Sequence, residues 1–134
     1  MKVIIDCNVW ISFLLGFQKE LIRDVLTSEH IDVYVCPQLT SEIENVATRS
    51  KISSRIHEGD VEKLFRIIKA YCYVATISRQ ANAHIRDSKD VYLLSLAETI
   101  DADYIVSGDN DLLVLGRYNN TRIISPAQFR SLIK

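Results

Sequence analysis

With 134 residues, the chain is long enough to bury a continuous core without disulfides, and we expect one domain over residues 1–134. Hydrophobic residues make up 48% and charged residues 25% of the sequence, a balance that excludes a disordered chain. The formal net charge of −1 argues against a nucleic-acid binder that works through bulk positive charge, although a nuclease with bound metal ions and a local basic rim stays open.

Short β-branched runs alternate with longer segments of helical periodicity. In chain order the sequence predicts a strand over 3–5, helices over 9–15 and 19–28, a strand over 31–36, helices over 39–49 and around 61–68, a strand over 73–77, a helix over 88–100, a strand over 104–106, a short helix over 111–115, a strand over 121–124 and a last helix over 126–132. Strands that alternate with helices predict a mostly parallel sheet, here of five strands, covered by helices on both faces.

Acidic residues fall where such a fold brings them to one edge of the sheet. Asp6 follows the first strand directly, and Asp109 follows the fourth strand. Asp90 lies near the start of the helix over 88–100, and Glu42 lies in the first turn of the helix predicted from residue 39. Because ligands of open parallel sheets bind beyond the carboxyl ends of the strands, we expect these four carboxylates to point into one crevice.

Clustered carboxylates favour metal chemistry. Several carboxylates within a few ångströms repel each other unless a cation lies between them. Mg²⁺ prefers oxygen ligands and typically uses one or two carboxylates while it keeps several waters. Such ions activate water and stabilise a leaving oxygen, so no side-chain nucleophile is required. The sequence shows no Ser/His/Asp or Cys/His arrangement, which suits this chemistry.

Each acid also has a purely structural interpretation. Asp6 and Asp109 could cap the helices that follow them, and an acid at a helix start also interacts well with the helix dipole. Ser41 with Glu44 has the pattern of a capping box, which leaves Glu42 without that structural task. The gathering of four acids at one edge is what favours a functional site.

At these residues the sequence resembles the PIN-domain family. The resemblance runs in order through 3–9, 41–43, 86–97, 102–113 and 124–129, and its most specific stretch, at 103–113, reads DYIVSGDNDLL. By position it implies a catalytic quartet of Asp6, Glu42, Asp90 and Asp109. It implies metal binding by Asp6, Asp90 and Asp109, and supporting polar roles for Asn8, Asp87, Ser107 and Asp111.

The subgroup that the sequence resembles most is the VapC-like toxins of toxin–antitoxin pairs. This resemblance implies a three-layer α/β/α sandwich with a five-stranded sheet, in which the first and fourth strands are adjacent. It implies a ribonuclease that depends on Mg²⁺ or Mn²⁺ and leaves a 5′ phosphate and a 3′ hydroxyl. It also implies a homodimer and an antitoxin protein that blocks the acidic pocket.

RNA contacts are harder to place from the sequence. Arg49, Lys51 and Arg55 follow the helix that carries Glu42, and Arg86 flanks the later acids. We expect Arg49, Lys51 and Arg86 to meet RNA phosphates, although a run of charges is usually a solvated face.

Other classes of protein stay open at this stage. A haloacid-dehalogenase-type phosphatase needs a second Asp where Asn8 stands, and a phospho-receiver domain does not account for Glu42. A binding module without turnover, or a nuclease of RNA maturation, would keep the same acids.

Three cysteines complete the sequence-based picture. Cys7, Cys36 and Cys72 are widely spaced and form no CxxC pair, which predicts reduced, mostly buried thiols in a cytoplasmic protein and argues against a zinc site. The N-terminal residues do not have the pattern of a signal peptide.

Overall fold

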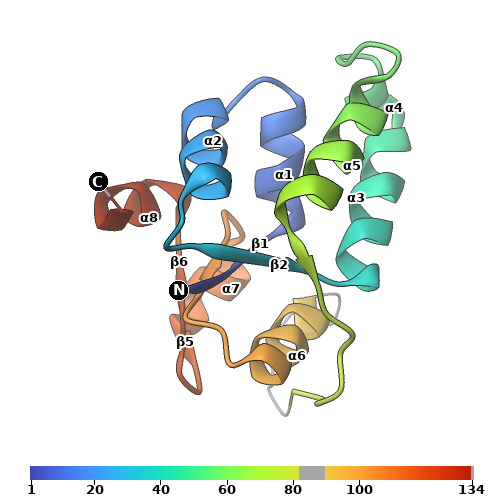
Figure 1. Cartoon of the computed structure of the whole chain (residues 1–134). Helices are drawn as coiled ribbons and strands as arrows, with labels where there is room; N and C mark the ends of the chain where they lie inside the picture. The colour runs from blue at the N-terminus through green and yellow to red at the C-terminus, as the bar shows by residue number, and fades with distance from the viewer. Residues whose placement is uncertain (82–89, 134) are drawn as a thin grey trace.

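A six-stranded sheet separates two layers of helices in the computed structural model, which describes residues 1–81 and 90–133 (Figure 1). The strands are β1 (Lys2–Ile5), β2 (Asp32–Val35), β3 (Tyr73–Val74), β4 (Tyr104–Val106), β5 (Arg117–Tyr118) and β6 (Thr121–Ile124). Their order is β3-β2-β1-β4-β6-β5, and every pair is parallel except β5 with β6.

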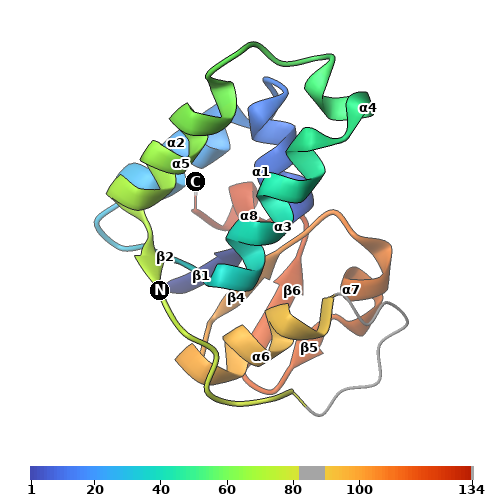
Figure 2. The same cartoon turned by 90° about the vertical axis from the view of Figure 1, so that its right-hand side faces the viewer.

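The helices follow the strands in alternation. They are α1 (Cys7–Leu14), α2 (Lys19–Thr27), α3 (Pro37–Thr48), α4 (Ser50–Ser53), α5 (Asp60–Tyr71), α6 (Val91–Ile100), α7 (Asn110–Leu115) and α8 (Pro126–Ile133). Figures 1 and 2 show α1, α2, α3 and α5 on one face of the sheet and α6 on the other. No helix in the described ranges is long and apolar enough to cross a membrane.

The predicted three-layer α/β/α architecture is confirmed, with one correction to the sheet. It has six strands rather than five, because β5 forms a two-residue antiparallel hairpin with β6 across a turn in which Asn119 adopts a φ of 52°. A two-residue strand is too short to show a periodic pattern in the sequence, and the one-turn helix α4 escaped prediction for the same reason.

The two central strands owe their position to continuous apolar runs. Val3, Ile4 and Ile5 are all at most 2% exposed, as are Ile105 and Val106 in β4. Strands buried on both faces read as unbroken apolar runs, so β1 and β4 take the middle of the sheet. They pair with Ile5 opposite Val106, which confirms that the first and fourth predicted strands are neighbours.

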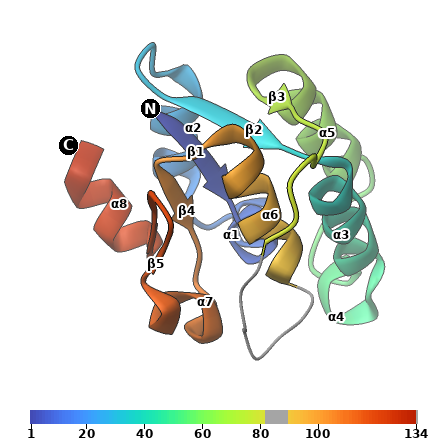
Figure 3. The same cartoon turned by 90° about the horizontal axis from the view of Figure 1, so that it is seen from below.

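Strand order reverses between β1 and β4. From β1 the chain builds β2 and β3 on one side, and it then crosses over to build β4 and β6 on the other. Figure 3 shows β1 between β2 and β4 in a view from the face that α6 covers. A reversal of this kind opens a crevice beyond the carboxyl ends of the two strands, which is where open α/β sheets bind ligands.

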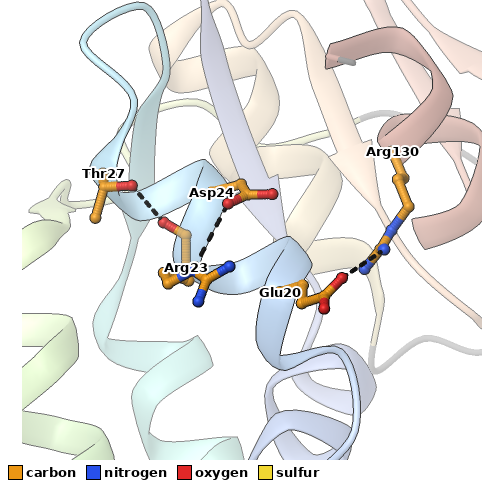
Figure 4. A network of polar contacts seen from close by, with 5 residues as sticks. All are labelled: Glu20, Arg23, Asp24, Thr27 and Arg130. Atoms are coloured by element: carbon orange, nitrogen blue, oxygen red, sulfur yellow. Dashed lines mark hydrogen bonds and ion pairs between the residues drawn. The ribbon is translucent and has the colours of Figure 1, made fainter.

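The last helix is held by a buried aromatic side chain. Phe129 of α8 is 1% exposed, and its ring centroid lies 5.8 Å from that of Tyr104. Arg130 also reaches Glu20 of α2 at 3.4 Å (Figure 4), but the Glu20 side chain is largely in solvent and that of Arg130 is partly exposed. Exposed ion pairs contribute at most about 1 kcal/mol, so the burial of Phe129 is the stronger attachment.

The cysteine prediction is confirmed as far as pairing and burial go. All three thiols are free, Cys7 and Cys36 are buried, and Cys72 is half-buried.

Candidate active site

Asp6 stands where β1 ends and α1 begins. Its N–H donates to the carbonyl of Val106 at 2.9 Å, which extends the pairing of β1 with β4 by one residue. One carboxylate oxygen, Oδ1, accepts from the N–H of Cys7 at 2.6 Å, and the other, Oδ2, accepts from the Ser107 hydroxyl at 2.6 Å. Only 4% of Asp6 is exposed, so its side chain is both buried and fixed.

Ser107 links the two strand-end acids. Its hydroxyl oxygen donates to Asp6 and also accepts from the N–H of Asp109 at 3.0 Å. Asp109 in turn caps α7, because its Oδ1 accepts from the N–H of Asp111 at 2.9 Å. The capping interpretation of Asp109 is therefore correct, and capping places its carboxylate at the same crevice as Asp6.

Asn8 ties the start of α1 to the turn after β4. Its Oδ1 accepts from the N–H of Gly108 at 3.3 Å, while its side chain lines the crevice. Asn8 and Ser107, two of the predicted supporting residues, thus connect α1 to the β4–α7 turn. Asp111 lies in the first turn of α7 and is absent from the lining of the crevice.

Glu42 reaches the crevice from a different part of its helix than predicted. Helix α3 begins at Pro37, so Glu42 lies in the second turn rather than the first. The capping box predicted for Ser41 and Glu44 is also wrong, because the N-cap is Cys36 and it makes no side-chain capping bond. Proline at the first helical position, where no N–H is needed, explains the earlier start.

Tyr92 of α6 is the site residue that the sequence did not reveal. Its hydroxyl donates to Oε1 of Glu42, which joins α6 to α3 across the crevice. Burial raises the pKa of Tyr92 well above its usual range, and the bond to the Glu42 carboxylate raises it further, so the phenol keeps its proton. The available signal was a polar hydroxyl within the apolar run at 91–97.

Together these elements form one pocket of about 330 Å³. It is lined by the four predicted acids, Asp6, Glu42, Asp90 and Asp109, together with Cys7, Asn8, Ile11, Val46 and Arg49. Asp90, at the N-cap of α6, is 6% exposed and makes no side-chain capping bond, unlike Asp109. The structure therefore brings the quartet together, and its catalytic role stays a prediction.

The negative charges of the pocket act on one another. The pKa of Asp6 is raised to about 6, chiefly by burial and to a smaller extent by the charges of Glu42 and Asp109, while the hydrogen bonds from Ser107 and Cys7 oppose the rise. Burial likewise raises the pKa of the Cys7 thiol, with added contributions from Glu42 and Asp6. Cys7 is therefore a protonated neighbour and is poorly suited to act as a nucleophile.

The donor set of this pocket fits a hydrated divalent cation. Its acidic ligands are all carboxylates, and a cation would relieve the repulsion that burial imposes on Asp6. Among the described residues, no three His, Cys, Asp or Glu side chains are arranged as a ready-made metal site. Mg²⁺ needs only one or two carboxylates when waters complete its shell, so the pocket suits an ion held partly through water.

Of the predicted RNA-contacting residues, the structure brings one to the pocket. Arg49, exposed at the end of α3, lines it. Lys51 lies exposed on α4 and is not part of the lining. Arg86 and the predicted supporting residue Asp87 lie outside the described residues.

A larger cavity, of about 690 Å³, lies between the end of α6 and the β5–β6 turn, where Glu98, Asp101 and Asn120 contribute to its lining. It is near the amino end of β4, opposite the edge where parallel sheets bind ligands. Topology therefore favours the smaller acidic pocket as the candidate active site.

Comparison with known families agrees with this geometry. Residues 2–111 match the PIN domain family, a stretch that contains all four acids and covers most of the sequence. The chain therefore belongs to the PIN-domain family, whose members are generally nucleases. No curated protein matches the sequence.

We expect Asp6→Asn to stabilise the metal-free protein at neutral pH. The folded-state pKa of about 6 lies above the ordinary value of 3.8, so the fold favours the neutral acid. The contribution of Asp6 to stability is fully present below about pH 4 and is lost as pH rises through 6. In chelator at pH 7.5, Asp6→Asn should gain on the order of 1–3 kcal/mol, or a few degrees in Tm, and at pH 4 the gain should vanish.

Thermal melts of both proteins across this pH range check the expectation. Added Mn²⁺ should raise the Tm of the wild type more than that of Asp6→Asn, because an ion that binds only the folded state stabilises it. If the stability gained by Asp6→Asn did not change with pH, the raised pKa of Asp6 could not be its cause.

The Tyr92–Glu42 bond should appear as a coupling energy. In a double-mutant cycle of Tyr92→Phe and Glu42→Ala, the effects on unfolding should be non-additive by about 1 kcal/mol, since each change removes the same bond. Tyr118→Phe is the matched control, because the Tyr118 hydroxyl donates to Glu98 at 2.9 Å instead. Additive effects for Tyr92, or equal coupling of Tyr118 to Glu42, would contradict the link.

Proposed function

We propose that this protein is a metal-dependent endoribonuclease that hydrolyses RNA phosphodiester bonds. The observation that carries the proposal is the convergence of Asp6, Glu42, Asp90 and Asp109 on one pocket, at the strand reversal of a PIN domain. Family membership favours a nuclease over the phosphatase and receiver alternatives. Asn8 also argues against a phosphatase, which needs an Asp at this position. Here the Asn8 side chain accepts a hydrogen bond from the N–H of Gly108.

Asp6, Asp90 and Asp109 are the residues that would hold Mg²⁺ or Mn²⁺. When bound, such an ion lowers the pKa of water and stabilises the charge on the leaving oxygen. The chain contributes a fixed set of oxygens: the Ser107 hydroxyl orients the Asp6 carboxylate and the Asp111 N–H holds the Asp109 carboxylate, so neither must be ordered when substrate arrives.

Glu42 is the acid best placed to act on the attacking water. Its carboxylate is held by the hydroxyl of Tyr92, and it lies on α3, across the pocket from the strand-end acids. We propose that Glu42 orients the attacking water and accepts its proton. Because Tyr92 keeps its own proton, it positions Glu42 by donating to it and does not compete as a base.

Within the described ranges, Arg49 is the cationic side chain that lines the acidic pocket. It is exposed, so it can pair with a phosphate of the bound strand. We propose that Lys51 and Arg86 contribute further phosphate contacts.

The biological setting that we propose is a type II toxin–antitoxin system. In this setting the protein is a cytoplasmic homodimeric toxin, and a protein antitoxin covers the acidic pocket. These points rest on the resemblance to VapC-like proteins. The alternatives are an RNA-processing nuclease and an inactive binding module. An assay of RNA cleavage distinguishes the inactive module from the proposed nuclease.

The deciding experiment is cleavage of a panel of single-stranded and structured RNAs with Mg²⁺, with Mn²⁺ and with chelator. The wild type should cut only with metal and leave 5′ phosphates. Asp90→Asn and Glu42→Gln should lose on the order of 100-fold in rate. The matched control is Glu44→Gln, an exposed residue of the same helix outside the pocket, which should cut normally.

Cleavage that persists in chelator would contradict the metal-dependent mechanism. Equal losses in Glu42→Gln and Glu44→Gln would contradict the assignment of the pocket. A folded wild type that binds metal but cuts none of the RNAs would favour the binding module.

A further inference from the structure

A second pocket, of about 470 Å³, lies where α1 ends and α5 begins. We name it the basic pocket. Its floor is apolar and its rim is charged: the lining consists of Phe13, Leu14, Leu15, Gly16, Leu64 and Ile67, with Lys19, Arg55, His57, Asp60 and Lys63. Figures 1 and 2 show the end of α1 on the same side of the molecule as α4 and the start of α5.

The rim carries a net positive charge, with three cationic side chains against one acid. Lys19, Arg55 and Lys63 are all exposed, and the ion pairs found in the described part of the chain, Arg23–Asp24 and Arg130–Glu20, involve none of them. The acid on the rim, Asp60, accepts from the N–H of His57 at 2.8 Å. In a chain with a net charge of −1, such a concentration of cations favours an anionic ligand.

The basic pocket continues from the acidic pocket along α1. Asn8 and Ile11 line the acidic pocket, and Leu14 and Leu15 line the basic one. Ile11 and Leu15 are four residues apart and therefore share one face of the helix. At 1.5 Å per residue, the seven residues from Asn8 to Leu15 span about 10 Å, so a short stretch of nucleic acid can occupy both pockets.

The opposite wall supports the same path. Arg49 lines the acidic pocket at the end of α3, and Arg55 lines the basic pocket just beyond α4. A strand that leaves the carboxylates therefore passes from one arginine to the next. An acidic peptide would match the rim charge as well, but it would not explain why the cations continue a path that starts at the proposed cleavage site.

We propose that the basic pocket binds a nucleotide of single-stranded RNA that flanks the phosphate being cut. This inference rests on the proposed ribonuclease function and specifies its substrate class. Lys19, Arg55 and Lys63 pair with backbone phosphates, and a base rests on the apolar floor beside Phe13. A base can reach that floor only when it is out of a duplex, so the pocket selects unpaired RNA.

The test is a charge reversal with a matched control. The test variant carries Arg55→Glu and Lys63→Glu, and the control carries Arg66→Glu and Lys69→Glu, two exposed residues of α5 outside both pockets. Binding of a fluorescent single-stranded 12-nucleotide RNA is measured in chelator, where no metal-dependent cleavage occurs. The test variant should bind about tenfold more weakly than the control, and the slope of log K against log salt should fall by about 1.4, since each lost single-strand phosphate contact removes about 0.7.

Cleavage with Mg²⁺ gives an independent check. The test variant should raise KM for the 12-nucleotide RNA, whereas the control variant should keep the KM of the wild type. All proteins should give the same circular dichroism spectrum, and the single change Lys19→Glu should weaken binding in the same direction.

Two results would overturn the proposal. One is RNA binding that is equally affected in the test and control variants. The other is an acidic, leucine-rich peptide that binds the wild type but not the test variant while RNA binding stays unchanged, which would assign the pocket to a protein partner. Failure of the proposed ribonuclease function is distinguishable, because it would appear as a wild type that binds the RNA but never cuts it.

Discussion

The pairing of β1 with β4 is the constraint on which the site depends. Ile5 lies opposite Val106, and this register carries the Asp6 N–H to the Val106 carbonyl and the Ser107 hydroxyl to the Asp6 carboxylate. A shift of one residue would turn every side chain of the strand to the opposite face. Such a shift would also separate Asp6 from the Val106 carbonyl and from the Ser107 hydroxyl, so the register of the two buried strands fixes the position of the strand-end acids.

This arrangement lowers the stability of the metal-free fold and at the same time favours the binding of a cation. Burial of Asp6 beside Glu42 and Asp109 raises its pKa to about 6, so the charged form destabilises the fold at neutral pH. The same features make the pocket receptive to a cation, because a bound ion offsets both the burial and the repulsion. Ser107 and Tyr92 hold two of the acids in place beforehand, which lowers the cost of ordering the site around metal and RNA.

Sequence reasoning captured the features that are local or periodic. Apolar runs predicted the central strands, and acids at their ends predicted which side chains would meet. The position of Glu42 in the second turn of α3 was not predicted, because the helix begins earlier than expected, at Pro37. The role of Tyr92 was not predicted, because its partner Glu42 is 50 residues away in the sequence. The basic pocket is equally non-local: α1, α2, α5 and the segment after α4 each supply part of it, and no run of charge in the sequence reveals it.

The central claim is that the acidic pocket holds the divalent ion used for cleavage. Anomalous diffraction from crystals soaked in Mn²⁺ tests it most directly, because it locates the metal without reference to activity. We expect an anomalous peak in the pocket lined by Asp6, Asp90 and Asp109, and no peak there in Asp109→Asn crystals. Mn²⁺ bound elsewhere, with this pocket empty in a protein that still cuts RNA, would contradict it.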